Sequence, residues 1–162
     1  MIRVRPYAPE TDVPELAAIF HDAVQTGTAN LYTQAQRDHW SSQRPDASHW
    51  RERLEGLVTL VAEEDGALLG FMSMDMETAL LDLAFVRSDR ARAGIGAKLY
   101  DAMMAEAARR GHRRFTVEAS DASLPFFLKR GWTGTGHRRH GEGESEVITV
   151  LMELDTGSET AA

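Results

Sequence analysis

Two glycines, Gly94 and Gly96, stand where a short apolar run and a basic turn give way to a helical pattern. Glycines at such a junction remove the side chains that would hold a ligand away from the backbone. The first turn of a helix has N–H groups without a partner inside the helix, and it carries the positive end of the helix dipole. Further positive charge precedes the glycines in Arg87, Arg90 and Arg92. These features predict an anion site, most naturally for phosphate or pyrophosphate; the alternative is an ordinary helix start beside a solvated basic loop.

Two carboxylates are candidates for proton transfer. Asp82 is the only charged residue in the apolar run at residues 80–86, and an ionisable group in such a run is a place to look for function. Glu118 has a similar position in the next predicted strand. For both residues the alternative is structural, because each could open to water or pair with a nearby arginine. We expect no metal: His137 and His140 have no third ligand type near them in the sequence.

The elements that must position these residues follow from the hydrophobic pattern. Residues 80–86 suit a strand buried on both faces. A helix follows from residue 94, with Arg110 in its last turn and Gly111 just beyond its end, and residues 115–119 form the next strand. This is a strand–helix–strand crossover. Other strands are predicted at residues 2–5, 57–62, 67–74, 132–135 and 147–154, and other helices at 12–27, 33–40, 48–54 and 123–130. The order predicts a mixed α/β (α+β) fold, with helices on both faces of a mostly antiparallel sheet.

Three further predictions concern the ends of elements. Asp12 followed by Glu15 fits a capping box at the start of the first helix. The glycine-rich residues 136–144 are predicted to form a mobile hairpin tip. We expect a single domain over residues 1–154 and a polar, disordered tail at residues 155–162.

Composition limits the classes of function. The chain of 162 residues has no cysteine, which excludes disulfides, thiolate metal sites and a cysteine nucleophile. A net charge of −7 argues against non-specific nucleic-acid binding. The sequence has neither a signal-peptide pattern nor an apolar run that approaches the length of a membrane span. We therefore expect a cytoplasmic protein without a nucleic-acid or membrane partner.

The sequence resembles the GNAT superfamily of acetyl-CoA-dependent N-acetyltransferases in two motifs. The family motif Gln/Arg-x-x-Gly-x-Gly/Ala corresponds to Ala91-Arg92-Ala93-Gly94-Ile95-Gly96, preceded by a family-like Leu83-Ala84-Phe85-Val86. The second motif is a strand, a polar residue, a short helix and a Gly-aromatic pair, found at residues 117–120 and 125–132. The specific match covers residues 57–154. The resemblance implies a GNAT-like fold and transfer of acetyl from acetyl-CoA to a primary amine of a small molecule or peptide.

The resemblance also implies roles for particular residues of a cofactor site. Backbone groups of Ala84, Phe85 and Val86 would pair with the pantetheine arm of acetyl-CoA as a further strand does. Ser120 would face that arm, and Phe127 would lie near the thioester with its neighbour Phe126. The amides that would cradle the pyrophosphate belong to Arg92, Ala93, Gly94, Ile95, Gly96 and Ala97.

Two positions depart from the family pattern. Ala91 stands where the family has Gln or Arg, so that charge would come from Arg90 or Arg92. Phe127 stands where the family frequently has a general-acid tyrosine, and a phenyl ring cannot give a proton. A non-catalytic acyl-CoA-binding or sensing module of the same fold is therefore the alternative function. A dinucleotide-binding oxidoreductase is a weaker alternative, because it would need a third glycine where the chain has Leu99.

The reaction itself makes a base more useful than an acid. A thiolate leaves readily because the pKa of a thiol is about 8.5, whereas an alkylamine with a pKa of about 10.4 must lose a proton before it attacks. Asp82 and then Glu118 are the candidate bases. Tyr32 is a candidate acid, because it follows the first helix, where the resemblance places the acceptor site. Without a cysteine we expect direct transfer, and an outer strand of the sheet could mediate a homodimer.

Overall fold

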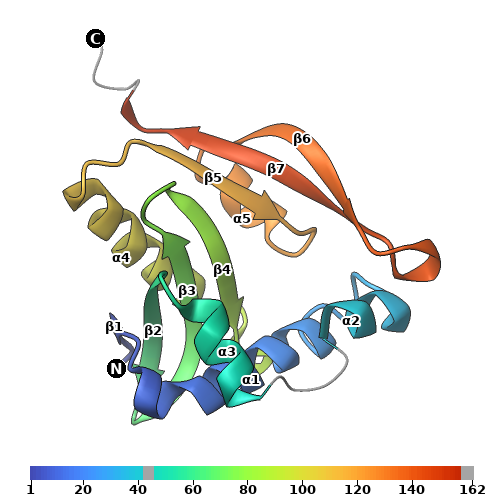
Figure 1. Ribbon diagram of the computed structural model, residues 1–162, viewed down its shortest axis with the longest axis horizontal. Coiled ribbons are helices and arrows are strands. Elements are labelled where there is room, and N and C mark those ends of the chain that lie inside the picture. Colours follow the sequence, from blue (N-terminus) through green and yellow to red (C-terminus); the bar gives the residue numbers. More distant parts are fainter. Residues whose placement is uncertain (42–45, 158–162) are drawn as a thin grey trace.

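The computed structural model describes residues 1–41 and 46–157, and the predicted strands and helices are all present there (Figure 1). The strands are β1 (Arg3–Pro6), β2 (Val58–Glu64), β3 (Ala67–Asp75), β4 (Leu80–Val86), β5 (Arg114–Ala119), β6 (Thr133–His140) and β7 (Val147–Asp155). The helices are α1 (Pro9–Gln25), α2 (Gln34–Ser41), α3 (Ala47–Leu54), α4 (Ile95–Arg109) and α5 (Leu124–Leu128), with 3-10 turns η1 (Ser88–Arg90) and η2 (Gly143–Ser145). From residue 158 onward the predicted tail lies outside the described residues. Within those two ranges, no helix combines the length and apolar character that a membrane crossing needs.

The seven strands form one sheet in the order β1-β2-β3-β4-β5-β7-β6. The β4–β5 pair is parallel, with α4 as its crossover, and the other pairs are antiparallel. Helices α1 and α3 cover one face of the sheet, and α4 and α5 cover the other (Figure 1). The predicted fold class is therefore confirmed: a mixed α/β fold with a mostly antiparallel sheet, helices on both faces and a strand–helix–strand crossover.

Each face of the sheet has its own hydrophobic core. On one face, Leu99 and Met103 of α4 are fully buried against the sheet together with Phe127 of α5. On the other face, Leu16 of α1 packs with Phe71 of β3 and with Leu83 of β4. Strands β3 and β4 lie between the two cores, which explains why their sequences are apolar runs rather than alternating patterns.

Strands β4 and β5 pair over a short distance and then diverge. The parallel register joins residues 80–81 of β4 to residues 116–117 of β5. Strand β4 nevertheless continues to Val86, paired with β3 along its other edge. In that antiparallel ladder Asp82 is an extra residue between two consecutive pairs, which makes it a β-bulge. A bulge bends its strand and increases the local twist, so it turns β4 away from β5 at the point where their pairing stops.

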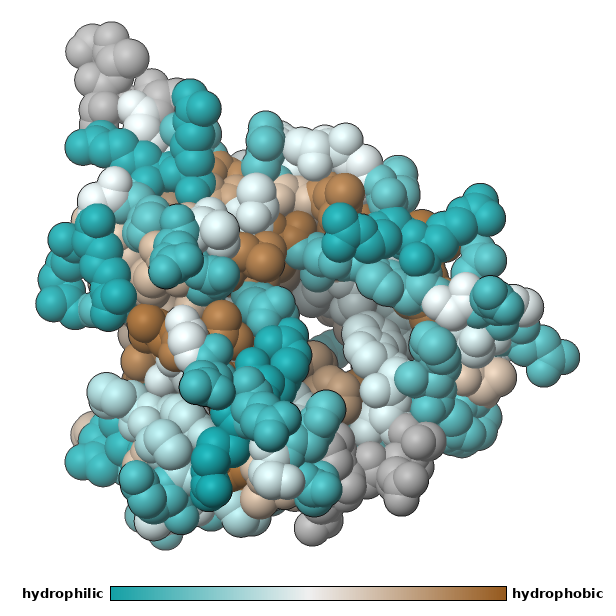
Figure 2. Space-filling model, viewed as in Figure 1, coloured by the Kyte–Doolittle hydropathy of each residue, from teal (hydrophilic) through white to brown (hydrophobic). Residues whose placement is uncertain are grey.

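We call the diverging segments the fork: residues 82–86 of β4, and residues 118–119 of β5 together with Ser120, which follows that strand directly. Across the gap of the fork, the backbone groups of the two segments do not pair with each other. The ribbons separate visibly here, with β4 and β5 pointing in different directions (Figure 1). Figure 2 shows the surface hollowed between β4 and the β5–β7–β6 side of the sheet. The fork is therefore a place where a ligand can reach strand backbone.

The predicted capping box is wrong, because α1 begins earlier. The helix starts at Pro9, and no side chain caps it at Ala8. Asp12 lies inside the first turn, where its buried carboxylate accepts hydrogen bonds from the Ala8 N–H (2.7 Å) and from both terminal nitrogens of Arg5 (2.8 and 3.0 Å). Asp12 thus ties the helix to β1 instead of capping it.

The predicted hairpin tip is also too long. Residues 136–140 belong to β6, which pairs with β7 up to His140, and the turn occupies the residues that follow. Strand β6 is one of the two edge strands of the sheet, and nearly all of its residues are exposed. Its sequence therefore has no buried side chains from which an alternating pattern could be recognised.

The ion pair between Arg5 and Asp12 gives a prediction for stability. Burial by itself would raise the pKa of Asp12, but the hydrogen bonds from Arg5 and Ala8 outweigh it and hold the pKa below its ordinary value of 3.8. Asp12→Asn should therefore lower the free energy of unfolding by about 2 kcal/mol at pH 7, because it removes the buried charge that pairs with Arg5 and leaves Glu63 as the remaining carboxylate partner of that guanidinium. Chemical denaturation measures this loss.

The same experiment tests the electrostatic origin of the loss. A lowered pKa contributes stability that is complete above the ordinary value and is lost as the pH falls through the lowered one. The difference between wild type and Asp12→Asn should therefore shrink below about pH 4. The exposed Glu10, in the same helical turn, supplies the control Glu10→Gln, which should have little effect. A difference that does not depend on pH would contradict this assignment.

Candidate functional site

The glycine turn before α4 has the conformation and the open space that anion binding needs. Gly94 has a φ of +80°, and a side chain built on it would meet nothing within 4 Å. Two residues earlier, Arg92 also has a positive φ, of +65°. Ile95 is 1% exposed and anchors the first turn of α4 in the core. Open space therefore lies beside a fixed first turn, whose N–H groups have no partner inside the helix.

The three arginines of the turn have different roles. Arg87 pairs with Asp89, and Arg90 pairs with Glu64 of β2 at 3.0 Å. Arg92 is exposed and forms no hydrogen bond or ion pair within residues 1–41 and 46–157. Arg92 is therefore the arginine of the turn whose charge is free to meet an anion.

The last turns of α1 and the segment that connects α1 to α2 together span the open end of the fork. At the β4 side, the carboxylate of Asp22 in α1 accepts hydrogen bonds from the Ser88 N–H (2.7 Å) and from its hydroxyl (2.9 Å). At the β5 side, the Tyr32 phenol oxygen accepts a hydrogen bond from the Asp121 N–H (2.8 Å). The two contacts hold the end of α1 and the connecting segment in place, and Tyr32 is thereby brought to the end of β5 beside Ser120.

The phenol of Tyr32 is held in its protonated form, as a proton donor requires. It is 6% exposed and its ring packs edge-on against Trp40. Burial raises the pKa of the phenol, and the hydrogen bond from Asp121 only partly opposes that effect. Because the phenol oxygen accepts from a backbone N–H, its own proton is left to donate elsewhere. The phenol is therefore protonated at neutral pH.

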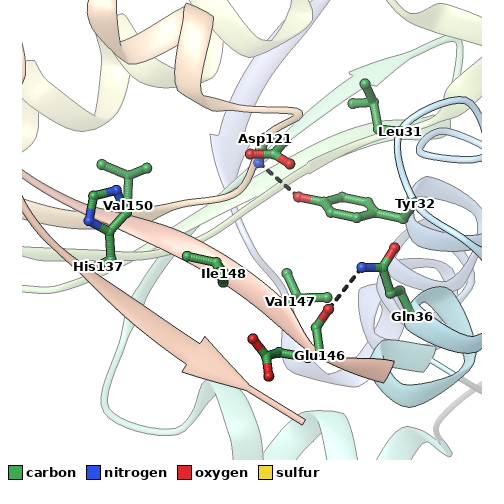
Figure 3. A pocket seen from close by; sticks show the side chains of 9 residues that line it. All are labelled: Leu31, Tyr32, Gln36, Asp121, His137, Glu146, Val147, Ile148 and Val150. Carbon is green, nitrogen blue, oxygen red and sulfur yellow. Dashed lines mark hydrogen bonds between the residues drawn. The ribbon is translucent and has the colours of Figure 1, made fainter. Parts of the chain in front are cut away.

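A pocket of about 390 Å³ adjoins Tyr32 on the side of the β6–β7 hairpin (Figure 3). Gln36 of α2 closes part of it by donating to the Glu146 carbonyl at 2.8 Å. Two large apolar side chains that are half exposed, Leu31 at 48% and Ile148 at 45%, also line it. The lining residues are Leu31, Tyr32, Gln36, Asp121, His137, Glu146, Val147, Ile148 and Val150. The pocket therefore combines apolar side chains with carboxylate, imidazole and phenol groups in its lining.

The two candidate bases lie on the two arms of the fork, each next to the last β4–β5 pair. Asp82 forms an ion pair with Arg53 of α3, at 2.6 Å between Nη1 and Oδ2. Glu118 accepts hydrogen bonds from the Thr149 hydroxyl (2.6 Å), from Arg138 (3.2 Å) and from the His140 ring. Both carboxylates therefore have cationic partners that the sequence alone could not identify.

The partners of Glu118 determine its protonation state. Burial alone would raise the pKa of this carboxyl, but the hydrogen bonds from Thr149 and His140, together with the charge of Arg138, lower it below its usual value. Glu118 is thus an ionised carboxylate whose oxygens are already occupied. A carboxylate in that state is a weak proton acceptor.

The remaining predicted cofactor residues lie in two environments. Ala84, Phe85 and Val86 are partly exposed along the fork, and Ser120 exchanges hydrogen bonds with Ser123 at the start of α5. Phe127 is 2% exposed and packs in the core against Trp132, at 5.2 Å between ring centroids. Its neighbour Phe126 lies beside Gly96 and is covered by the Arg130 guanidinium, 3.5 Å from the ring centroid.

The sequence interpretation missed the contacts that connect distant segments. Asp22 was not singled out and His140 was considered only as a metal ligand, whereas the structure places Asp22 against Ser88 and His140 against Glu118. A polar residue in an amphipathic helix or an exposed strand has no local signal that names its partner. Among the described residues, no group of three or more potential metal ligands occurs.

Comparisons with known proteins agree with this geometry. The family model of the acetyltransferase (GNAT) domain matches residues 28–154 of the chain. A crystal structure of a GCN5-related N-acetyltransferase from Rhodopseudomonas palustris is 31% identical, with a TM-score of 0.85, and the match covers 94% of each chain. No curated protein matches the sequence. The chain therefore belongs to the GNAT family of acetyltransferases.

Two more distant structures share the fold with a bound ligand. The PaiA N-acetyltransferase from Thermoplasma acidophilum, in complex with coenzyme A, is 16% identical with a TM-score of 0.76, and the match covers 96% of this chain and 99% of that one. The yncA protein from Salmonella typhimurium, with its cofactor acetyl-CoA, is 20% identical with a TM-score of 0.72, and the match covers 100% of this chain and 98% of that one. At this identity the likeness concerns the fold.

The two glycines of the turn should respond differently to the same substitution. Gly94→Ala should lower the free energy of unfolding by about 1 kcal/mol, because alanine is strained at a positive φ. Gly96→Ala is the matched control: its added carbon would meet Phe126 at an ordinary 3.7 Å. In the first turn of a helix it should be neutral or stabilise by up to about 1 kcal/mol. Chemical denaturation measures both, and equal losses would contradict the left-handed turn.

Proposed function

We propose that this protein transfers an acetyl group from acetyl-CoA directly to a primary amine of a small molecule or peptide. The proposal rests on two neighbouring features of the structure, the fork and the glycine turn at its open end. The turn suits the pyrophosphate of a nucleotide, and the unpaired edge of β4 suits an extended arm with amide groups. Membership of the GNAT family supports the same reading.

The proposed position of acetyl-CoA follows from these two features. Its pyrophosphate would accept hydrogen bonds from amides of residues 92–97, with Arg92 adding charge. Its pantetheine arm would run along Ala84, Phe85 and Val86 toward the closed end of the fork. Three strand residues span about 10 Å, so this path carries the thioester from the turn toward Asp82 and Glu118.

The proposed chemistry needs no acyl-enzyme. The lone pair of the acceptor nitrogen forms the new N–C bond, and the electron pair of the C–S bond leaves with sulfur. The nitrogen loses a proton to a base, and the thiolate gains one to become the thiol of CoA. Phe127 cannot supply that proton, and its burial keeps it within the core. We assign the donor role to Tyr32, whose phenol is protonated and stands beside Ser120 on the fork.

The acceptor would approach through the pocket beside Tyr32. Its carboxylates, Asp121 and Glu146, suit a positively charged amine, and Leu31 and Ile148 suit an apolar portion of the same molecule. Pocket residues come from the α1–α2 segment, α2 and the β6–β7 hairpin, which are separate from the turn before α4. Acceptor choice would therefore be set by different residues from those that bind the nucleotide.

Turnover of acetyl-CoA tests the proposal directly. Release of CoA is measured with acetyl-CoA and simple primary amines (butylamine, phenethylamine, putrescine and an alanyl peptide), and the acetylated product is identified by mass spectrometry. Amide formation with at least one amine is the expected result. Binding of acetyl-CoA without turnover of any amine would instead support a non-catalytic acyl-CoA-binding module of the same fold.

Placing a negative charge in the glycine turn should abolish CoA binding. CoA at about a hundred times its dissociation constant should stabilise wild type by about 2.7 kcal/mol, which raises Tm by about 5–10 °C in a chain of this length. Ala93→Glu should remove this shift, because the new carboxylate would repel the pyrophosphate. The control Ala105→Glu adds the same charge at an exposed position in α4 and should keep the shift. Loss of the shift in both variants, or in neither, would contradict the site.

Removing the Tyr32 hydroxyl should slow the chemical step. Tyr32→Phe should lower kcat about 10- to 100-fold with little change in acetyl-CoA binding, because a general acid acts in the transition state. Steady-state kinetics with the best amine measures this. Tyr7→Phe is the control, since the Tyr7 hydroxyl is buried without a hydrogen-bond partner in the described part of the chain. Equal kcat values for the two variants would exclude Tyr32 as the acid.

A further inference from the structure

The carboxylate of Asp121 has no partner in the structure, unlike the carboxylates of the fork. Asp82 forms an ion pair with Arg53 at 2.6 Å. Glu118 forms one with Arg138 at 3.2 Å. Across the described ranges, 1–41 and 46–157, the Asp121 side chain takes part in no ion pair or hydrogen bond, and the residue is exposed. Its negative charge is therefore available to a ligand.

This free carboxylate lies beside the phenol of Tyr32, in the lining of the pocket (Figure 3). The Asp121 N–H donates to the phenol oxygen at 2.8 Å, and covalent geometry then keeps the Asp121 carboxylate within about 7 Å of that oxygen. Burial is the main cause of the raised pKa of Tyr32, and the charge of Asp121 adds to it. The charge is thus close to the proposed proton donor. The other pocket carboxylate, Glu146, is already 3.6 Å from Arg139.

The nitrogen that attacks the thioester has no use for this charge. It attacks through its lone pair, so it must be neutral when the N–C bond forms. A carboxylate beside that nitrogen favours the charged ammonium, which opposes the loss of its proton. An uncompensated carboxylate next to the reaction centre is therefore best explained by a second cation of the acceptor, one that stays charged throughout the reaction.

The rest of the pocket suits an aliphatic chain between the two nitrogens. Leu31 and Ile148 are half-exposed and line the pocket together with Val147, so methylene groups can cover their apolar surface. An extended chain advances about 1.2 Å per bond, which puts the nitrogens of putrescine about 6 Å apart. This length is comparable with the reach from the Tyr32 phenol to the Asp121 carboxylate.

We propose that Asp121 selects an aliphatic diamine as the acceptor, by holding one ammonium group while the other nitrogen takes the acetyl group. The inference names the substrate class of the proposed acetyl transfer and rests on it. No pattern in the sequence marks Asp121, which follows the end of β5 by two positions. Its proximity to Tyr32 arises from the fold.

The covalent step keeps its balance with such an acceptor. The reacting nitrogen forms the N–C bond and loses one proton, the C–S electron pair leaves with sulfur, and the thiolate takes a proton from Tyr32. The ammonium held by Asp121 neither gains nor loses a proton. The products are the thiol of CoA and a monoacetylated diamine with one positive charge.

Substitution of Asp121 separates recognition of the acceptor from folding and from catalysis. The side chain is exposed and makes no contact of its own to lose within the described residues. The bond to Tyr32 comes from the backbone N–H, so it survives any change of the Asp121 side chain except proline. Asp121→Asn should therefore keep the Tm of wild type and its shift with CoA.

The test compares putrescine with pentylamine, in which a methyl group replaces one ammonium group. The ratio of kcat/KM for the two amines is measured in each enzyme, because the amines differ in their own pKa. In Asp121→Asn the ratio should fall about 5- to 10-fold, through a higher KM for putrescine, since the ammonium is bound alike before and during the reaction. The control Asp101→Asn removes an exposed carboxylate of α4 and should keep the wild-type ratio.

Charge reversal gives an independent test of the same contact. Asp121→Lys should lower kcat/KM for putrescine further, because two cations then oppose each other. It should raise kcat/KM about 5- to 10-fold for 4-aminobutyrate, which carries a carboxylate at the far end of its chain. Pentylamine should change little in either variant.

The outcomes distinguish this inference from the proposed function. An unchanged putrescine-to-pentylamine ratio in Asp121→Asn, with an active wild type, would overturn the inference and leave the acetyl transfer standing. An equal fall in kcat for both amines would also overturn it, because Asp121 would then act on the reacting nitrogen. If wild type acetylates none of the amines, the proposed function fails and the diamine assignment falls with it.

Discussion

The pairing of β4 with β5 stops after two residue pairs, and the arrangement of the site follows from where it stops. Each strand is fixed on its other edge, β4 by β3 and β5 by β7, so neither can turn back toward the other. The extra residue at Asp82 bends β4 at this point. The sheet therefore opens from a closed end between its two halves, and the turn before α4 lies beyond the open end of the β4 arm.

An open strand edge in the middle of a sheet has an energetic consequence. Backbone N–H and C=O groups that are shielded from water without a partner cost about 1–3 kcal/mol each. In the fork these groups can be hydrated, because the surface is hollowed beside them (Figure 2). A ligand with amide groups spaced along an extended arm could replace that water with direct hydrogen bonds, as an added strand does. The same opening brings Tyr32, Asp82 and Glu118 to one region from three different elements.

The features that could be predicted from the sequence are those with a local cause. Apolar runs gave the central strands, periodicity gave α4, and Gly94 marked a turn that does have a positive φ. Strand β6 could be placed only in part, because its residues are exposed and show no alternation. The bulge at Asp82 also escaped prediction, since it is defined by the register of β4 against β3 and leaves no pattern within β4 itself.

Side-chain partners were the least predictable part of the site. Asp82 and Arg53 are 29 residues apart, Glu118 and His140 are 22 apart, and Tyr32 and Asp121 are 89 apart. The first pair is created by the packing of α3 on the sheet, the second by the order of β5, β7 and β6, and the third by the α1–α2 segment at the end of β5. The candidate side chains could be recognised in the sequence, but which of them form ion pairs or hydrogen bonds depends on the three-dimensional fold.

The central claim is that CoA binds in the fork, and backbone amide chemical shifts test this most directly. CoA would be titrated into the ¹⁵N-labelled protein while the backbone resonances are followed. The account predicts that the largest changes occur in two separate stretches, residues 84–86 on β4 and residues 92–97 in the glycine turn, with Ser120 also affected. Changes confined to the pocket around Leu31 and Ile148, with the β4 edge and the turn unaffected, would contradict it.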